Sequence, residues 1–352
     1  MKIGIHYPCY SKDADGGIEK LIRKLHAHLK KKGHDVEIIT LNLNPYSSWQ
    51  HDCSVFSQSL NLLNSVRIYL KRFDVIHSHS PLLALPLLPC SRVVLTYHTY
   101  ERKDTAKMNA LRRFIHKRVL DLLAFNSRHA CRVIAVSDHV KRNVQHDARI
   151  NDVEVIKNGV DLDYIEGNIR KNPFADGVNV VAIGRISREK GFDLLIEAAK
   201  NVRAHFHIFG PFSDRKYAKE LQKLIEKSKL KNVKLHGKID EKEKYEHMRY
   251  ADVFVMPSRE EGLSFAAIEA VASSAAVVSS DIAPLKEVFG ESALYFSKEN
   301  AEDLADQINK MIKDRKLRER LREKIKERKK LFRIEKVLDR HLAIYEELSS
   351  GS

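Results

Sequence analysis

The sequence has few of the residues that cross-link a chain, bind a metal or cross a membrane. Among its 352 residues are one tryptophan and four cysteines, Cys9, Cys53, Cys90 and Cys131. No two cysteines form a C-x-x-C pair, which excludes the usual zinc and dithiol motifs and predicts reduced, buried thiols. No run reaches the roughly 18 uncharged apolar residues of a membrane helix. Charged residues follow the start of the chain too closely for a signal-peptide core, which predicts a cytoplasmic location.

Acidic residues are in the minority, and the basic excess is uneven. The formal net charge is +15, and the excess is larger in residues 1–160 than in residues 161–333. The densest basic segment, from Arg102 to Arg118, contains Asp104 as its one acidic residue. Such a segment attracts the phosphates of a nucleotide, an anionic lipid or a nucleic acid. Aromatic residues are not interleaved with the basic ones, so nucleic-acid binding is kept only as an alternative.

Two common nucleotide-binding motifs are also missing. Neither half of the chain has G-x-G-x-x-G after its first expected strand, and G-x-x-x-x-G-K-[ST] occurs nowhere. Their absence argues against a dinucleotide-dependent oxidoreductase and against a P-loop nucleotidase.

What the sequence does contain is an alternation of short apolar runs with longer amphipathic segments, which is typical of parallel sheets with crossover helices. In the first half it predicts strands Lys2–Ile5, Val36–Leu41, Asp74–His77, Arg92–Tyr97, Arg132–Val136 and Val153–Ile156, with helix Ile18–Lys32. In the second half it predicts strands Val178–Gly184, Ala204–Phe209, Val233–Leu235, Val253–Met256 and Ala276–Ser279. The helices expected there are Phe192–Asn201, Lys216–Lys229, Ser264–Ser273 and Ala301–Lys330.

The pattern therefore predicts an α/β protein with two Rossmann-like domains, residues 1–160 and 161–333. A last helix, Ile334–Leu348, is expected to return to the first domain, so that residues 334–349 belong to it. Ligands of such folds bind at the carboxyl ends of parallel strands. We therefore expect the two parallel sheets to face each other across a ligand-binding cleft.

Two candidate groups lie in the first half. Gly16 and Gly17 precede a helix, where exposed backbone N–H groups and the helix dipole favour an anion, although such a pair is more often a tight turn. His98 ends an apolar strand, where these folds place functional groups, although a structural role is commoner for a single histidine. Two pairs of histidines lack a nearby acidic or cysteine residue that would complete a metal site and are interpreted as structural. They are His77 with His79 and His205 with His207.

Two more candidate groups lie in the second half. Arg185 and Lys190 flank the loop after its first strand, from which both could neutralise a diphosphate, with a solvated basic loop as the alternative. Glu261 precedes a helix, and Glu269 lies two turns along it. One carboxylate could bind sugar hydroxyls and the other a ribose diol, with a helix-start charge and an incidental polar face as the alternative. Because the helix is otherwise apolar, we expect Glu269 to be buried and to have a partner.

With these motifs in this order, the chain resembles the family 4 glycosyltransferases of the GT-B fold over nearly its whole length. The matching motifs are Gly16-Gly17-x-Glu19, Gly33-His34-x-Val36, Asp74-Val75-Ile76-His77, Tyr97-His98-Thr99, Val133-Ile134-Ala135-Val136-Ser137, Asn158-Gly159-Val160-Asp161, Gly184-Arg185 with Lys190-Gly191, and the E-x7-E of Glu261 and Glu269. Within the family, the chain is similar to the phosphatidylinositol mannosyltransferases and related enzymes with lipid-linked acceptors.

The resemblance implies an activity. Family members move a hexose or N-acetylhexosamine from a nucleotide-diphosphate sugar to an acceptor, with retention at the anomeric carbon and without a metal or other cofactor. A UDP-sugar is expected in preference to a GDP-sugar, and a lipid-linked sugar or cell-envelope glycan is the expected acceptor. Domain 1–160 would bind the acceptor and domain 161–333 the nucleotide sugar. Other GT-B activities, such as a sugar-nucleotide epimerase or a phosphorylase, are the alternatives.

The resemblance also implies a role for each matching residue. Arg185 and Lys190 would hold the diphosphate and stabilise the leaving group, and Glu261 would bind hydroxyls of the donor hexose. Glu269 would hold the ribose, and His98 would contact the sugar near the reacting centre. The other donor-binding residues would lie against the diphosphate, the sugar or the acceptor. They are Gly16, Gly17, Gly184, Gly262, Leu263, Ser264 and Phe265.

The chain departs from the family pattern near the E-x7-E helix. Ser274 and Ala276 replace the usual glycine and proline, and the loop after the second strand of this half reads Gly210-Pro211-Phe212. Ser264 and Phe265 stand where the motif often has other small or apolar residues. These departures put the base and sugar preference in question more than the reaction.

The basic segment Arg102–Phe125 also has a predicted role. It combines its cations with apolar residues in a pattern suited to an amphipathic helix on an anionic membrane surface. A solvated helix face is the alternative. The pattern predicts a protein that is peripheral on the inner face of the membrane.

Overall fold

The computed structural model describes residues 1–8, 10, 16–40, 68, 71–80, 92–99, 118, 121, 124, 125 and 127–350. The chain divides into two compact units, Met1–Asn158 with Glu335–Ser352, and Gly159–Ile334. These limits lie one or two residues from the sequence-based boundaries at 160 and 333.

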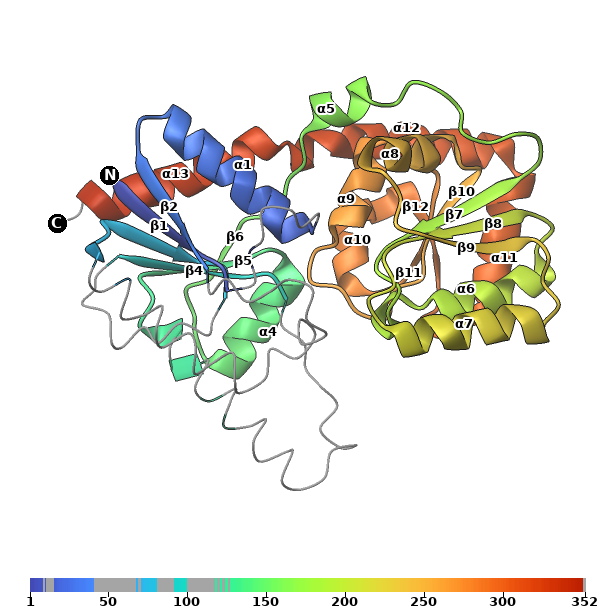
Figure 1. Ribbon diagram of the computed structural model, residues 1–352, viewed down its shortest axis with the longest axis horizontal. Helices are drawn as coiled ribbons and strands as arrows, with labels where there is room; N and C mark the ends of the chain where they lie inside the picture. The colour runs from blue at the N-terminus through green and yellow to red at the C-terminus, as the bar shows by residue number, and fades with distance from the viewer. Residues whose placement is uncertain are drawn as a thin grey trace. The chain divides into compact units, whose positions relative to one another are not determined.

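The first unit is built on a parallel sheet, as predicted (Figure 1). Its strands are β1 Lys2–His6, β2 Asp35–Ile39, β3 Val75–Ser78, β4 Val93–Tyr97, β5 Arg132–Ala135 and β6 Glu154–Val155. They lie in the order β2-β1-β3-β4-β5-β6, and each pair of neighbouring strands is parallel. Strands β1, β3 and β4 are therefore neighbours, and their carboxyl ends lie at one edge of the sheet.

The described helices of this unit include one that the sequence predicted clearly. Helix α1, Gly17–Lys31, buries Leu21, Ile22, Leu25 and Leu29, which recur at the three- and four-residue spacing of one helix face. Helix α4, Asp138–Ala148, was not predicted; the side chain of Ser137 caps it by accepting from the N–H of Val140. The last helix, α13, spans Ile334–Ser350.

The second unit has a parallel sheet in the order β12-β11-β10-β7-β8-β9. Its strands are β7 Asn179–Ile183, β8 His205–Phe209, β9 Val233–Gly237, β10 Val253–Met256, β11 Val277–Ser280 and β12 Ala293–Phe296. The last of these was not predicted. Strands β7 and β10 are neighbours although they are far apart in the sequence. The loops that follow them leave the sheet side by side, which positions the candidate site.

The helices of the second unit correct one prediction and add several elements. They are α5 Leu162–Gly167, α6 Phe192–Ala198, α7 Arg215–Lys227, α8 Glu241–Tyr250, α9 Phe265–Ala272, α10 Ala283–Phe289, α11 Ala301–Lys313 and α12 Arg315–Arg328. The single helix predicted for residues 301–330 was wrong, because the chain leaves the helical conformation at Asp314. The Asp314 carboxylate accepts from the N–H of Leu317 at 2.9 Å and so starts a new helix.

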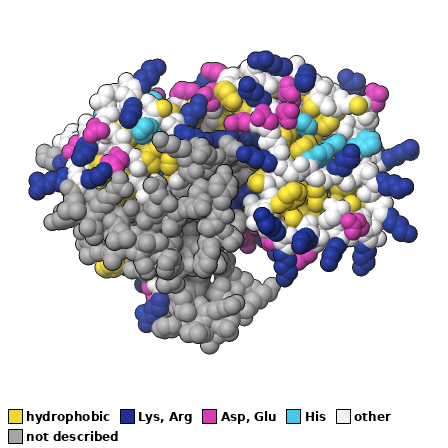
Figure 2. All heavy atoms as spheres, viewed as in Figure 1, with side chains coloured by type: hydrophobic (Ala, Val, Ile, Leu, Met, Phe, Trp, Pro, Cys, Tyr) yellow, Lys and Arg dark blue, Asp and Glu magenta, His cyan; other side chains and the backbone are white. Residues whose placement is uncertain are grey.

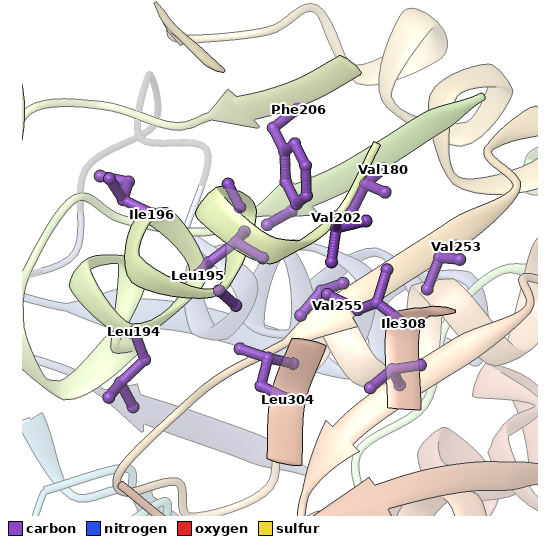
Figure 3. Packing of buried hydrophobic residues seen from close by; sticks show 14 of the residues in the cluster. Val180, Leu194, Leu195, Ile196, Val202, Phe206, Val253, Val255, Leu304 and Ile308 are labelled. Atoms are coloured by element: carbon purple, nitrogen blue, oxygen red, sulfur yellow. The ribbon is translucent and has the colours of Figure 1, made fainter. Parts of the chain in front are cut away.

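One face of the second sheet is covered by α6, α7 and α11. Figure 3 shows Leu195 of α6 and Leu304 and Ile308 of α11 pointing toward Val180 and Val255 of the sheet. All five residues belong to one cluster of buried side chains. This packing holds β7 and β10 rigidly, so the loops at their carboxyl ends have a stable base.

Some predictions concern residues that the structure describes only in part. Most of the basic segment Arg102–Phe125 and three cysteines, Cys9, Cys53 and Cys90, lie outside the described residues. The fourth, Cys131, is half-buried rather than buried. Among the helices that the structure describes, none is both long and apolar enough to span a membrane.

Candidate functional site

Lys190 and Glu261 form an ion pair in the second unit. Lys190 ends the 3₁₀ turn Arg188–Lys190 after β7, and Glu261 lies between β10 and α9. The Lys190 Nζ lies 2.6 Å from Glu261 Oε1, and their side chains are 15% and 7% exposed. Ser258 Oγ donates to the same carboxylate oxygen at 2.8 Å. The structure thus brings together two residues that the sequence placed at one site, because β7 and β10 are neighbouring strands.

Glu269 has the partner that its buried position required. It lies on α9, where it is 8% exposed, and its Oε1 accepts from Lys244 Nζ at 2.6 Å. Lys244 belongs to α8, and its ammonium also lies 4.8 Å from the centre of the Tyr245 ring. Nothing in the sequence distinguished Lys244 from the other lysines of this Lys- and Glu-rich segment. Both carboxylates of the E-x7-E motif are therefore paired with lysines.

Arg185 pairs with Glu189 in the loop after β7. Its side chain is 55% exposed and lies 3.6 Å from Glu189. Burial acts to raise the pKa of Glu189, but the hydrogen bond from Ser187 and the nearby cations of Arg185 and Lys190 lower it on balance. The Arg185 guanidinium is thus accessible at the edge of the loop.

Close backbone contacts connect the loops after β7, β8 and β10. A Cβ at Gly191, whose φ is 65°, would lie 2.0 Å from the carbonyl oxygen of Pro257. A Cβ at Gly210, whose φ is 153°, would lie 1.7 Å from the carbonyl oxygen of Gly184. Only glycine permits these approaches. Gly184, predicted to bind the donor, therefore also has a packing role against the Gly210-Pro211-Phe212 loop.

The start of α9 lies shortly after Glu261, with the helix beginning at Phe265. Ser264 is the N-cap residue, and its side chain makes no capping hydrogen bond. Leu263 and Ser264 are buried, while Gly262 and Phe265 are half-buried. The positive end of the helix dipole lies at this point, which favours a nearby anion. The four residues predicted to contact the donor thus form one continuous segment beside Glu261.

In the first unit, Gly16 and Gly17 form the start of α1. Gly16 is the exposed N-cap residue, and Gly17 is the first helical residue. A Cβ at Gly16 would lie 2.1 Å from Glu19 Oε2, so the Glu19 carboxylate folds back toward the N-cap, as in a capping box. The predicted glycine pair is therefore at a helix N-terminus.

His98 belongs to a cluster of histidines at the carboxyl ends of β1, β3 and β4. Its Nε2 lies 2.8 Å from His79 Nδ1, and their rings stack. His77 Nδ1 contacts the hydroxyl of Tyr345 on α13, and its Nε2 contacts Thr96 Oγ1 at 2.7 Å. His77 therefore makes contacts within the core of the first unit. His79, which was also interpreted as structural, contacts the candidate site residue His98. His341 of α13 stacks on His77.

Burial keeps these histidines neutral. It lowers the pKa of His98 to about 3, with a further contribution from the proximity of His341. Burial and the neighbouring histidines also hold the pKa of His77 and His79 well below its ordinary value. Two buried ring nitrogens, His79 Nε2 and His98 Nδ1, have no hydrogen-bond partner among the described residues. The pair can therefore offer one donor and one acceptor to a ligand.

A second histidine group lies on the second unit, where Figure 2 shows histidines on the visible face. His207 Nδ1 lies 3.1 Å from His236 Nε2, and His207 Nε2 lies 3.1 Å from Asn179 Oδ1. Partial burial, together with nearby histidines, lowers the pKa of His207 to about 4. In the part of the chain that the structure describes, no group of three or more His, Cys, Asp or Glu residues is arranged to hold a metal ion.

Two family models match the two halves of the chain. Residues 15–164 match Glycosyltransferase Family 4, and residues 166–328 match Glycosyl transferases group 1. The chain is a family 4 glycosyltransferase. The resemblance seen in the sequence motifs is thereby confirmed.

Curated relatives of this glycosyltransferase carry related names. It is 32% identical over 222 residues to an uncharacterised glycosyltransferase of Methanocaldococcus jannaschii, a match that covers 62% of this chain and 60% of the relative. It is 25% identical over 355 residues to the phosphatidyl-myo-inositol mannosyltransferase of Mycobacterium leprae, which covers 91% of this chain and 90% of the relative.

Solved structures confirm the predicted GT-B fold of the glycosyltransferase. The sucrose-phosphate synthase of Thermosynechococcus elongatus superimposes with a TM-score of 0.83 at 19% identity, over 100% of both chains. Anabaena HepE, solved in complex with UDP and glucose, superimposes with a TM-score of 0.73 at 20% identity, over 99% of this chain and 100% of that one. At these identities the likeness establishes the fold of the two Rossmann-like units.

Proposed function

We propose that this glycosyltransferase moves a hexose or N-acetylhexosamine from a UDP-sugar to a lipid-linked or glycan acceptor, with retention and without a metal. The observation that carries the proposal is the Lys190–Glu261 ion pair, which is largely shielded from solvent. A nucleotide-diphosphate sugar carries anionic phosphates next to neutral hydroxyls. The phosphates can pair with Lys190 while hydroxyls donate to Glu261, so the donor can replace each residue's present partner.

The leaving group is stabilised by cations of the chain in this proposal. As the bond between the anomeric carbon and the diphosphate oxygen breaks, negative charge grows on the diphosphate. Lys190 and the accessible Arg185 would balance that charge, supported by the N-terminus of α9. The acceptor hydroxyl would form the new bond on the same face of the sugar, and its proton would pass to the departing phosphate oxygen.

Other residues would orient the donor and the sugar. Glu269, held by Lys244, would accept from the ribose hydroxyls. His98 would offer the buried Nδ1 to a sugar hydroxyl near the reacting carbon. The preference for UDP is supported by the fold neighbour HepE, whose structure contains UDP and glucose.

The proposed acceptor rests on relatives and on the basic segment. A relative that matches most of the chain is named a phosphatidyl-myo-inositol mannosyltransferase. The segment Arg102–Phe125, which lies mainly outside the described residues, would hold the protein against an anionic leaflet. Assays with and without anionic vesicles carrying the acceptor test this part, and an activity indifferent to vesicles would count against it.

The test of the donor proposal compares two neighbouring glutamates. Glu260 is exposed, whereas the Glu261 side chain is 7% exposed and ion-paired. We expect Glu261→Gln to lower the rate of sugar transfer by about 10²–10³-fold, as expected for loss of one positioned polar group, while Glu260→Gln stays near wild type. Equal rates for both variants would exclude Glu261 from the donor site.

The ligand itself is identified by a thermal-shift panel of UDP, GDP, ADP and their sugar conjugates, with and without EDTA. Binding raises the melting temperature in proportion to the logarithm of concentration over Kd. We expect the largest shift with UDP compounds, unchanged by EDTA. Release of nucleotide diphosphate only when acceptor is present would separate transfer from epimerase activity. No shift with any compound would contradict the proposed function.

A further inference from the structure

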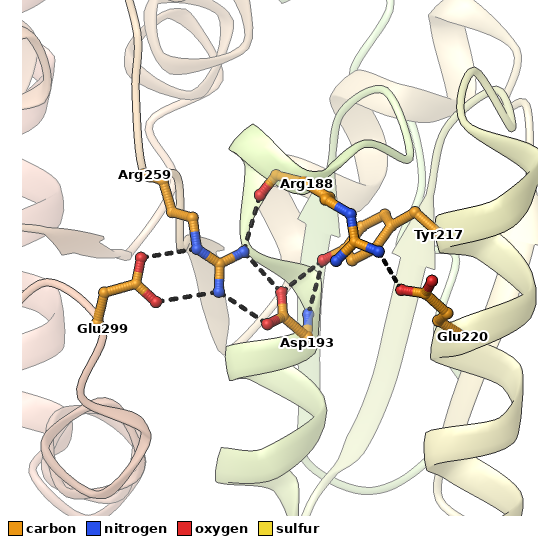
Figure 4. A network of polar contacts seen from close by, with 6 residues as sticks. All are labelled: Arg188, Asp193, Tyr217, Glu220, Arg259 and Glu299. Carbon is orange, nitrogen blue, oxygen red and sulfur yellow. Dashed lines mark hydrogen bonds and ion pairs between the residues drawn. The ribbon is translucent and has the colours of Figure 1, made fainter. Parts of the chain in front are cut away.

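Arg259 lies two residues before Glu261, and every N–H group of its guanidinium has an acceptor (Figure 4). Nε donates to Glu299 Oε1 at 2.7 Å, and Nη2 donates to the other oxygen of the same carboxylate at 3.0 Å. Nη2 and Nη1 also donate to the two oxygens of Asp193, at 2.7 and 2.8 Å. The remaining N–H of Nη1 donates to the carbonyl of Arg188 at 2.8 Å. A guanidinium has five such donors, and all five are used.

The partners of Arg259 lie on two segments of the second unit, one that runs from the 3₁₀ turn into α6 and one that follows β12. Arg188 opens the 3₁₀ turn that ends in Lys190. Asp193 lies in the first turn of α6, and Glu299 follows β12. The backbone N–H of Arg259 also donates to the carbonyl of Glu189 at 2.7 Å. Arg259 therefore joins the segment that carries Glu261 to the segment that carries Lys190, through both its backbone and its side chain.

Asp193, the partner of Arg259 on α6, makes further hydrogen bonds. The Tyr217 hydroxyl of α7 donates to Asp193 Oδ1 at 2.5 Å. Arg188 lies over the Tyr217 ring at 5.1 Å and is paired with Glu220. Burial acts to raise the pKa of Asp193, but hydrogen bonds from Arg259 and Tyr217 lower it on balance, so the carboxylate stays ionised. Glu299, the other carboxylate partner of Arg259, is more exposed than Asp193, because 50% of its side chain is accessible to solvent.

We propose that Arg259 is a positioning residue for the donor diphosphate and sugar. It sets the separation of Lys190 and Glu261 by locking their two loops together, and it has no donor left to contact the substrate itself. The inference rests on the proposed function for its catalytic consequence, but the connection between the loops does not depend on it. A positioning effect of this kind can change rates by about tenfold to a hundredfold when a group moves by about 1 Å.

The fork geometry of arginine is essential to this role. A lysine at position 259 would keep the positive charge but offer three N–H donors from a single point, which cannot satisfy two carboxylates and a carbonyl in a plane. If charge alone mattered, lysine would restore function. If the fork matters, lysine and glutamine should behave alike.

Three variants test the proposal. Arg259→Gln and Arg259→Lys should both raise the donor KM, or lower kcat, by about tenfold or more. Glu299→Gln is the matched control, because it removes a contact of the same guanidinium that reaches neither the Lys190 segment nor Glu261. It should stay within about twofold of wild type. Wild-type kinetics for Arg259→Lys would overturn the requirement for the fork, and wild-type kinetics for Arg259→Gln would overturn the proposal.

A second measurement is independent of activity. The amides of Lys190 and Gly191 donate to Ser187 and Arg188 within the turn. Their hydrogen exchange should be at least tenfold faster in Arg259→Gln and unchanged in Glu299→Gln. Unchanged hydrogen exchange in Arg259→Gln would overturn the proposed connection between the two loops, even if no donor is turned over. Faster hydrogen exchange in Arg259→Gln would support the connection between the loops. If the wild-type protein then bound no sugar nucleotide, the proposed function would be contradicted instead.

Discussion

The first unit places histidines at the carboxyl ends of its strands, whereas the second unit places the Lys190–Glu261 ion pair in the loops at this edge of its sheet. His77 and His79 are buried and His98 is half-buried, all beside other neutral rings, and all three have lowered pKa values. Lys190 and Glu261 are similarly enclosed but neutralise each other at 2.6 Å. Burial without a counter-charge removes the charge from a titratable group, whereas burial beside a counter-charge can retain it.

This difference suits two kinds of ligand. A neutral imidazole pair offers one donor and one acceptor, which fits hydroxyl groups. A lysine released from its carboxylate offers a full positive charge, which fits phosphate. The proposed division of labour, with sugar and acceptor chemistry near His98 and diphosphate binding near Lys190, follows from this contrast.

Removing the Lys190 ammonium should have the largest effect on the difference between the two units, because it removes the cation of the charged pair. Lys190→Ala leaves Glu261 without its ion-pair partner in a site where its side chain is 7% exposed. We expect sugar transfer to fall by about 10²–10³-fold and the unfolding free energy by about 3 kcal/mol. Steady-state kinetics and denaturant unfolding measure the two effects.

Lys200→Ala is the control for that variant. Lys200 pairs with Glu197 on the surface of the same unit, and both side chains are 39% exposed. Surface pairs contribute about 0–1 kcal/mol, so this variant should keep its activity and nearly all of its stability. A Lys190→Ala protein as active as Lys200→Ala would mean that Lys190 does not act on the diphosphate.

Lowering the pH should destabilise the first unit through its histidines. Because the pKa of His98 is about 3 when folded and 6.5 ordinarily, the unfolded chain binds its proton first as the pH falls. The contribution of His98 to stability is therefore full above about pH 6.5 and declines down to about pH 3, by about 1.4 kcal/mol per pH unit. His77, His79 and His341 change in the same direction.

Chemical denaturation at pH 7.5, 6, 5 and 4 measures this decline. NMR of the imidazole resonances assigns the decline to His98, since its ring should remain neutral in the folded protein at pH 5. The half-buried His207 of the second unit has a pKa of about 4, so its contribution to stability should also decline as the pH falls, but over a narrower pH range, between about 6.5 and 4. A His98 imidazole that titrates near pH 6.5 in the folded state would refute this account.

The smallest effect is expected at the far end of α9 from Glu261. Ser274 has a φ of 54° in the left-handed region, where the family usually has glycine, and it is 2% exposed. Ser274→Gly should stabilise the protein by about 0.5–1 kcal/mol without changing donor preference. The neighbouring Ser273 has a φ of −79°, so Ser273→Gly should not stabilise. Denaturant unfolding distinguishes them, and a changed donor preference in Ser274→Gly would revive a role in specificity.

Much of the fold could be predicted from the sequence. Buried parallel strands appear as short apolar runs, and amphipathic helices such as α1 have a clear period, so the two-sheet architecture was predictable. The strongly polar α8 was missed because it lacks an apolar period, and β12 was missed because it is only four residues long. The break at Asp314 was missed because a capping aspartate inside a basic amphipathic pattern is locally inconspicuous.

The sequence by itself determined which residues stand at the ends of strands and the starts of helices, because these positions depend on local periodicity and glycine placement. Only the tertiary structure decided which of them meet. Lys190 and Glu261 are brought together by the pairing of β7 with β10, and Glu269 meets Lys244 through the packing of α8 against α9. Arg259 and His79 acquired their significance in the same way, since strand order and packing are long-range properties that no local pattern contains.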